Sequence, residues 1–205
     1  MNTELRVAFF TDSYLEVNGV AHTSRMLAAF TKRRELPFLC VHAAAEKGGK
    51  AEKQLIQEGS LQRLVLPRTK IGFALDADLR FDLLLWRHAK WVVEAVRHFN
   101  PDVIHITGPS DIGLLGVYVA LKLKLPMVMS WHTNVHEYAG QRLSKLLETL
   151  LPFLPDVRQF SLAGSAERLS LKLMMLFYKF GKVFLAPNEE LGAMIARNLA
   201  AGLRT

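Results

Sequence analysis

The 205-residue sequence has a single cysteine, Cys40, which excludes an intramolecular disulfide and a cluster of thiolate metal ligands. Cys40 lies in the apolar run "LPFLCVHA", so we expect a buried strand residue in a reducing compartment. No uninterrupted apolar run reaches the ~18 residues needed to span a bilayer. The N-terminus, "MNTELRVAFFTD", lacks the pattern of a signal or transit peptide. We therefore expect a cytoplasmic chain, either in solution or resting on the inner face of the membrane.

Several chemical signatures are also missing from the sequence. There is no G-x-G-x-x-G pattern and no P-loop, so nicotinamide-cofactor and Walker-type ATP functions lose their main support. Zinc-ligand spacing, a G-x-S-x-G elbow and nucleic-acid-binding signatures are absent as well, so we expect no metal and no nucleic acid. In contrast, 26 Lys and Arg against 19 Asp and Glu give a net charge of +7, which fits a phosphate-bearing ligand or an anionic membrane.

Apolar runs of strand length recur along the sequence, with helix-length segments between most of them. The runs are near-continuous rather than alternating, as expected when helices cover both faces of a sheet. This order predicts an α/β fold with a Rossmann-like, doubly wound parallel sheet. The predicted strands are Leu5–Phe10, Phe38–His42, Leu61–Leu66, Val103–Ile106, Met127–Trp131 and Val183–Ala186.

Two helices between these strands have a clear polar and apolar periodicity. The first is predicted from about residue 20 to 34, with Met26, Leu27 and Phe30 facing the core. The second is predicted over about residues 79–99. Its expected core side chains are Leu85, Val92, Val96 and Phe99, and its expected polar stripe is Arg87, Lys90, Glu94 and Arg97.

The stretch "TDSYLEVNGV" joins the first strand to the first helix. A helix N-terminus presents unpaired backbone N–H groups and a positive dipole end, which together attract anions. Gly19 would let an anion approach the backbone closely. The alternative is that Asn18 and Gly19 simply form a turn and cap, and Asp12 and Ser13 can each cap a turn too.

The stretch "MVMSWHTNVHEY" runs from a predicted buried strand into a polar and aromatic cluster. In open α/β sheets the ligand crevice lies beyond the carboxyl ends of the strands, so His132 should project into it. An imidazole there can act as a general base or donate a hydrogen bond. Thr133 supports this interpretation, whereas His136 and Tyr138 are weaker candidates. Structural or solvated roles are expected for His42, His88, His98 and His105.

A third strand end, "HITGPSDIG", leads through a Gly-Pro turn into a helix. Ser110 can cap that helix or contact a ligand, and both interpretations stay open. Because the carboxyl ends of parallel strands share one edge, Gly19, Ser110 and His132 would converge on one small-molecule crevice.

The stretch from Arg142 to Lys182 is basic and apolar, with seven Lys and Arg against three Asp and Glu. Its helical periodicity would allow it to lie on an anionic membrane, with Met174, Leu176 or Phe177 at the acyl boundary. A core helix with one solvated face is an equal alternative.

Three stretches together resemble a known family: "RVAFFTDSYLEVNGVAHTSRMLAAF", "PDVIHITGPSDIGLLGVYVALKLKLPMVMSWHTNVHEY" and "VFLAPNEELGAMI". They are similar to the N-terminal half of GT-B retaining glycosyltransferases of family four, and the lipid-glycosylating, sulfoquinovosyltransferase-like branch looks closest. The resemblance covers nearly the whole chain. It implies a single acceptor-side Rossmann-like domain over residues 1–187, followed over 188–205 by an interdomain helix leading to an absent C-terminal donor domain.

The resemblance also implies residue roles. His132 would be catalytic, near the transferred sugar and the acceptor, with Thr133 beside it. Asn18 and Gly19 would let the donor diphosphate approach the backbone. From their places near the strand ends, and not from the resemblance, we expect the remaining substrate contacts to be Asp12, Gly108, Ser110 and Tyr138. The retaining reaction would need no metal and no cofactor, with a nucleotide sugar as the donor substrate.

The donor-domain signatures, an E-x7-E motif and a basic phosphate clamp, are not found in the sequence. We therefore expect little activity from this chain alone. The expected partners are a nucleotide sugar held through a second domain, a lipid or sugar acceptor, an anionic membrane surface, and a separate chain carrying the C-terminal domain. The alternative function is a non-catalytic Rossmann-like module that binds an anionic lipid or a partner chain.

Overall fold

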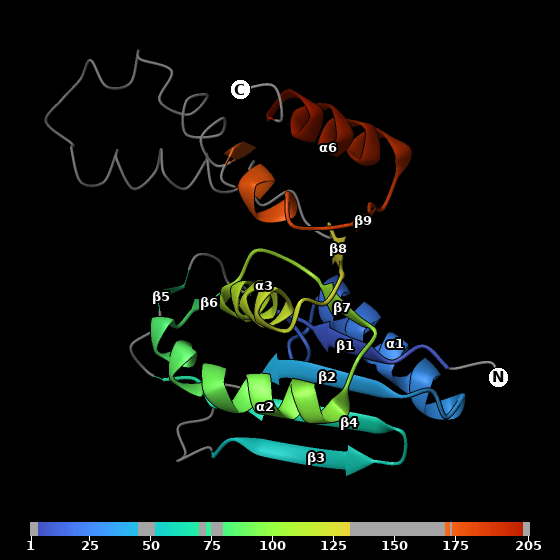
Figure 1. The fold of residues 1–205 in the computed structure, drawn as a ribbon, viewed down its shortest axis with the longest axis vertical. Helices are drawn as coiled ribbons and strands as arrows, with labels where there is room; N and C mark the ends of the chain where they lie inside the picture. Colours follow the sequence, from blue (N-terminus) through green and yellow to red (C-terminus); the bar gives the residue numbers. More distant parts are fainter. Residues whose placement is uncertain are drawn as a thin grey trace, which may run out of the picture. The chain divides into compact units, whose positions relative to one another are not determined.

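A computed structural model describes residues 4–44, 52–69, 73–74, 80–131, 171–172 and 174–202 (Figure 1). The chain separates into two compact units. The first comprises residues 1–130 and 181–185, and the second comprises residues 131–180 and 186–205. The predicted division into 1–187 and 188–205 stays a prediction.

A seven-stranded sheet in the order β3-β4-β2-β1-β7-β8-β9 forms the centre of the first unit. All neighbouring strands pair in parallel except β3, which is antiparallel to β4. The strands of this sheet are β1 Val7–Phe10, β2 Phe38–Ala43, β3 Gln54–Glu58, β4 Leu61–Leu66, β7 Val103–Ile106, β8 Met127–Ser130 and β9 Val183–Leu185.

The remaining elements are helical, apart from a two-stranded ribbon. They are α1 Gly19–Arg33, the ribbon β5 Phe73–Ala74 and β6 Arg80–Phe81, the 3₁₀ helix η1 Leu83–His88, α2 Ala89–Phe99, α3 Asp111–Leu123 and α6 Glu189–Gly202. The predicted Rossmann-like α/β fold is confirmed, with each of the six predicted strands in the sheet. Strand β3 was not predicted, because its sequence QLIQE is mostly polar. It lies at the sheet edge, where a strand has little to bury.

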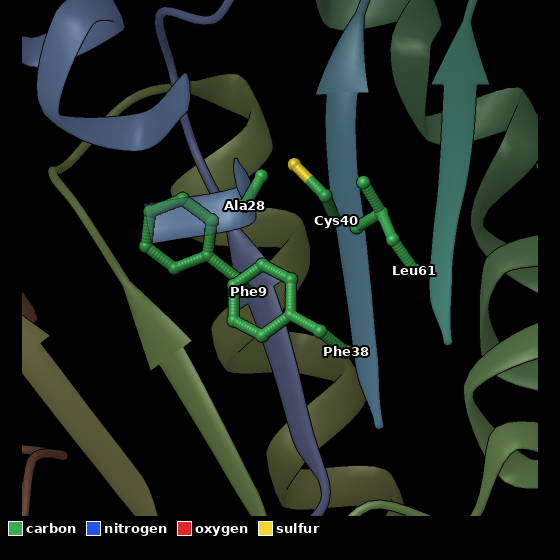
Figure 2. Packing of buried hydrophobic residues seen from close by; sticks show 5 residues of the cluster. All are labelled: Phe9, Ala28, Phe38, Cys40 and Leu61. Atoms are coloured by element: carbon green, nitrogen blue, oxygen red, sulfur yellow. The ribbon is translucent and has the colours of Figure 1, made fainter. Parts of the chain in front are cut away.

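The two faces of the central strand β1 bury different neighbours. Phe9 packs in a cluster with Ala28 of α1 and with Phe38, Cys40 and Leu61 (Figure 2). Side chains alternate along a strand, so the next residue, Phe10, lies on the opposite face. There α3 approaches closely, because a Cβ added to Gly116 would be 2.9 Å from the Phe10 ring. Helix α2 packs against α3. Therefore α1 covers one face of the sheet, and α3 with α2 covers the other.

Helix α1 buries small side chains rather than the large ones we predicted. Met26 and Phe30 are 51% and 43% exposed, so their predicted core positions are wrong, and Leu27 is only half-buried. Small side chains let a helix backbone approach the sheet closely, and the larger apolar residues then fall outside the contact stripe. The buried stripe is Ala21, Ser24, Ala28 and Thr31.

The predicted helix over residues 79–99 is shorter than expected. Strand β6 and the 3₁₀ turn η1 occupy its first part, and α2 begins only at Ala89. The side chain of Asp82 accepts a hydrogen bond from Leu84 N at 3.0 Å, which starts the 3₁₀ turn. The apolar face was predicted correctly, since Leu85, Val92, Val96 and Phe99 are all buried.

The second unit contains α6, which begins after Asn188, whose side chain accepts a hydrogen bond from Leu191 N at 2.9 Å. Trp131 and Tyr178 stack with ring centroids 5.1 Å apart. Met174 and Phe177 are buried, which argues against their predicted place in an acyl boundary, whereas Leu176 is 59% exposed. Among the described residues, no helix has the length and apolarity needed to cross a membrane.

Candidate functional site

The loop after β1 is held by its own polar side chains. Thr11 Oγ1 donates a hydrogen bond to Ser13 O at 2.8 Å and lies 2.8 Å from Ser24 Oγ of α1. Asn18 is the N-cap of α1, because its Oδ1 accepts from Ala21 N at 2.8 Å. Gly19 is exposed, and a Cβ there would meet nothing within 4 Å. The capping interpretation of Asn18 is therefore confirmed, while anion binding in the open space at Gly19 stays a prediction.

The loops after β1 and β7 meet at Asp12. Its backbone N–H donates to Thr107 Oγ1 at 3.2 Å, and its Oδ1 accepts a hydrogen bond from the Ser110 hydroxyl. The same Ser110 Oγ accepts from Gly113 N at 3.2 Å, so Ser110 also caps α3 as predicted. Gly108 lies directly against the Asp12 carboxyl, and any side chain there would collide with Oδ2. The structure thus brings Asp12, Gly108 and Ser110 together, as expected for ends of adjacent parallel strands.

The environment of Asp12 favours the protonated carboxyl. Burial, together with a smaller effect of the nearby Asp111 carboxyl, raises the pKa of Asp12 to about 7. The hydrogen bond from Ser110 and the charge of Arg68 act in the opposite direction but are outweighed. A carboxyl that titrates near neutral pH can both accept and donate hydrogen bonds, which suits it to contact hydroxyl groups.

A buried polar network next to Asp12 was not predicted. Asp111 pairs with Arg68 at 3.4 Å, and its Oδ2 accepts from the backbone N of Asp82 at 3.0 Å. The Asp82 carboxylate in turn accepts from the backbone N and the hydroxyl of Thr69. Burial raises the pKa of Asp111, opposed by Arg68. The network ties the loop after β4 to the start of α3, so Arg68 and Asp111 belong to the site. The available sequence signal was their position within a few residues of the ends of two predicted strands.

The end of β2 contributes an aromatic pair beside the β1 loop. The rings of Tyr14 and His42 stack with centroids 4.3 Å apart and an interplanar angle of 17°. His42 Nδ1 lies 2.8 Å from Ala43 O, and its buried Nε2 has no hydrogen-bond partner in the part of the chain that the structure describes. Burial lowers the pKa of His42 to about 4, so the imidazole is neutral at pH 7. Of the two predicted alternatives, a structural or a solvated histidine, the structure confirms the structural one for His42.

The remaining predicted site residues, His132, Thr133 and Tyr138, lie outside the described residues. The neighbouring Trp131, which follows β8 directly, is buried. Within the described ranges, no group of three or more His, Cys, Asp or Glu side chains is arranged to hold a metal ion.

Two of the curated relatives are each 26% identical to this chain. Alpha-monoglucosyldiacylglycerol synthase of Streptococcus pneumoniae aligns over 136 residues, which are 65% of this chain and 28% of that protein. GDP-mannose-dependent alpha-mannosyltransferase of Mycobacterium tuberculosis aligns over 137 residues, which are 66% of this chain and 34% of that protein. The aligned part is thus only about a third of each relative.

Solved structures resemble this chain at low sequence identity. An Escherichia coli structure described as trehalose-6-phosphate bound with UDP-2-fluoro glucose is 10% identical, with a TM-score of 0.48, over 97% of this chain and 43% of its own. Sucrose-phosphate synthase of Thermosynechococcus elongatus is 10% identical, with a TM-score of 0.42, over 89% of this chain and 47% of its own.

Assignment of the chain to a family rests on a match to a family model. The model described as Glycosyltransferase Family 4 matches residues 17–200, which is most of the chain and includes the α1 cap, the Asp12 partners Gly108 and Ser110, and the stretch around His132. This match confirms the resemblance seen in the sequence. The chain belongs to glycosyltransferase family 4.

Proposed function

We propose that this chain is the acceptor-side domain of a retaining glycosyltransferase that moves a sugar from a nucleotide-sugar donor to a lipid or carbohydrate acceptor. Membership of family 4 supports sugar transfer in general. The relatives' names add a monoglucosyldiacylglycerol product in one case and a GDP-mannose donor in the other. Because the relatives are much longer than the aligned part, a second domain would hold most of the donor.

The observation that carries the proposal is the meeting of Asp12, Gly108 and Ser110 at the carboxyl edge of β1 and β7. Ligand crevices of open α/β sheets lie at that edge. Asp12 is partly exposed, and only its Oδ1 accepts the Ser110 hydroxyl. The carboxyl therefore keeps capacity to bind a hydroxyl of the acceptor. Gly108 lacks the side chain that would displace the Asp12 carboxyl.

The donor diphosphate would approach the N-terminus of α1 at Gly19, where backbone N–H groups and the helix dipole favour negative charge. In this proposal His132 orients the transferred sugar or the acceptor hydroxyl, with Thr133 beside it and Tyr138 as a further substrate contact. Retention without a metal would depend on stabilising the leaving phosphate with N–H groups and with cations of the second domain.

Binding measurements on the purified chain test the division of labour. We expect nanodiscs that contain diacylglycerol to bind more tightly than matched nanodiscs without it, and UDP-glucose and GDP-mannose to bind only weakly. Asp12→Asn should weaken the diacylglycerol-dependent part of the binding about tenfold, as expected when the hydrogen-bonding carboxyl that contacts the acceptor is replaced.

Asp102→Asn is the matched control. The Asp102 carboxyl accepts from Arg6 N at 2.8 Å, where the chain enters β1, at the other end of that strand from Asp12. If both variants weaken the diacylglycerol-dependent binding equally, Asp12 does not belong to the acceptor site. Tight binding of either nucleotide sugar to the chain alone would overturn the proposed donor role of the second domain.

Turnover of the enzyme completed by its donor domain tests His132. His132→Ala should lower kcat by about 10²–10⁴-fold if the imidazole takes part in proton transfer. His136→Ala, four residues further along, serves as the neighbouring control. Normal turnover of His132→Ala would exclude a catalytic role, and an NMR assignment of the product anomer tests retention.

A further inference from the structure

The helical layer of the first unit exposes an aromatic and apolar surface that the proposed reaction does not use. Trp86 of η1 is 38% exposed, and its ring lies edge-on to Tyr118 of α3 with centroids 5.5 Å apart. Leu114 and Leu121 lie one helical turn before and after Tyr118 and are 37% and 53% exposed. Together with Lys90 and Lys122, these four residues are called the Trp86 surface below.

One basic side chain contacts the aromatic pair, and further exposed basic residues lie on the same helices. Lys122 Nζ donates to Tyr118 Oη at 3.1 Å and lies 5.4 Å from the centre of that ring. Lys90 is exposed in the first turn of α2, four residues after Trp86. Between residues 84 and 124 the exposed charged residues are five basic and two acidic, namely Arg87, Lys90, Arg97, Lys122 and Lys124 against Glu94 and Asp102.

This combination matches one kind of partner. Trp and Tyr rings prefer the boundary between headgroups and acyl chains, because they have an apolar body and a polar tip. Lys side chains beside them can lay their methylene stems on apolar surface and reach lipid phosphates with their charge. We propose that the Trp86 surface docks the first unit onto an anionic lipid bilayer. The proposal extends the lipid-acceptor function, but docking itself needs neither a donor nor an acceptor.

Helix α1 offers a contrasting surface on the opposite face of the sheet. It exposes Met26 and Phe30, with the Arg34 guanidinium 5.6 Å from the Phe30 ring and Arg33 exposed nearby. It exposes no Trp or Tyr. Because α1 and α3 cover opposite faces, a flat bilayer in contact with one of these surfaces does not reach the other. Helix α1 therefore supplies matched control variants.

Vesicle flotation of the full chain measures docking without any sugar chemistry. Vesicles of phosphatidylcholine alone and vesicles with 3:7 phosphatidylglycerol to phosphatidylcholine, both free of diacylglycerol, are the probes. We expect binding to the anionic vesicles only. Lys90→Glu with Lys122→Glu should lower the partition constant about tenfold or more, since each basic residue near an anionic surface contributes about fivefold.

The apolar part of the surface is tested separately. Trp86→Ser with Leu121→Ser should also lower binding to anionic vesicles about tenfold. Two control double variants should change binding to anionic vesicles less than threefold. They are Met26→Ser with Phe30→Ser, and Arg33→Glu with Arg34→Glu. Circular dichroism of each variant checks that the chain is folded. Equal loss in the α1 variants would show general charge attraction and overturn the proposal.

Quenching by brominated lipids locates the contact. The tryptophan fluorescence of the wild-type chain should be quenched by anionic vesicles that carry brominated acyl chains. Trp86→Phe should keep vesicle binding within about threefold and lose most of the quenching, because Trp131 is buried and Trp91 is only half-exposed. Unchanged quenching in Trp86→Phe, or no binding of the wild-type chain to anionic vesicles, would overturn the proposal and leave the acceptor experiment unaffected.

Discussion

Two neighbouring regions at the carboxyl edge of the sheet bury ionisable groups in different ways. Around Asp12 and Asp111, hydrogen bonds join the loops after β1, β4 and β7 into one network. At the end of β2, His42 relies on ring stacking with Tyr14 and leaves Nε2 without a described partner. Burial favours the neutral form of both groups, so it raises the pKa of Asp12 and lowers the pKa of His42. The first region is held by directional bonds, and the second by packing of a neutral ring.

The largest effect should come from removing the centre of the network. Asp111→Ala takes away the acceptor of Asp82 N and Ile112 N and the ion-pair partner of Arg68. Breaking a buried charged network is expected to lower the free energy of unfolding by about 3–5 kcal/mol, measured by urea denaturation.

His42→Phe is the matched change in the other region. It keeps an aromatic ring against Tyr14 and should lower the free energy of unfolding by less than about 1 kcal/mol at pH 7. If Asp111→Ala and His42→Phe lower the free energy of unfolding by similar amounts, then directional bonds in one region and ring packing in the other do not distinguish the two regions.

The second effect is an opposite pH dependence of the two regions. The folded pKa of His42 is about 4 against 6.5 in the unfolded chain, so its contribution to stability is lost as pH falls from about 6.5 to 4. The folded pKa of Asp12 is about 7 against 3.8, so its contribution is lost as pH rises from about 4 to 7. The groups acting on these two are Ser110, Asp111, Arg68 and Glu16 for Asp12, and Ala43, Arg63 and Glu16 for His42.

Single variants should separate the contributions of His42 and Asp12 to the pH dependence of stability. Relative to the wild type, His42→Phe should gain roughly 2–3 kcal/mol of unfolding free energy as pH falls from 6.5 to 4. Asp12→Asn should gain a similar amount as pH rises from 4 to 7. Urea denaturation at half-unit pH steps measures both. Parallel curves for the two variants would contradict the opposite shifts.

The smallest effect compares the two helix caps at this edge. Ser110→Ala should cost about 1–2 kcal/mol, because it removes the cap of α3 and the donor to Asp12. Asn18→Ala should cost about 1 kcal/mol, since it removes the cap of α1. In a double-mutant cycle, Ser110→Ala should couple to Asp12→Asn by 0.5 kcal/mol or more, whereas Asn18→Ala should be additive with it. Additivity in both cycles would mean that Ser110 acts only as a cap.

Local patterns accounted for much of the fold and part of the site. Apolar runs predicted the strands because a strand buried on both faces needs consecutive apolar residues. The Ser110 cap was predicted from its place before a helix, and Asn18 from its place after a turn. Met26 and Phe30 were misplaced because hydrophobicity does not reveal how closely a helix approaches a sheet. The ion pair of Arg68 and Asp111 was missed because the sequence does not show which charged residues from different loops face each other.

The sequence by itself determined the six predicted strands, the helix caps and membership of glycosyltransferase family 4. These depend on neighbouring residues and on motif order, which a linear sequence carries. Tertiary structure alone decided which face of α1 is buried, that Asp12 touches Ser110 98 residues away, and that Trp86 meets Tyr118 on one exposed surface. The reason is physical: pairing of β1 with β7 and packing of α3 against η1 bring distant residues together, and burial then sets their charge states.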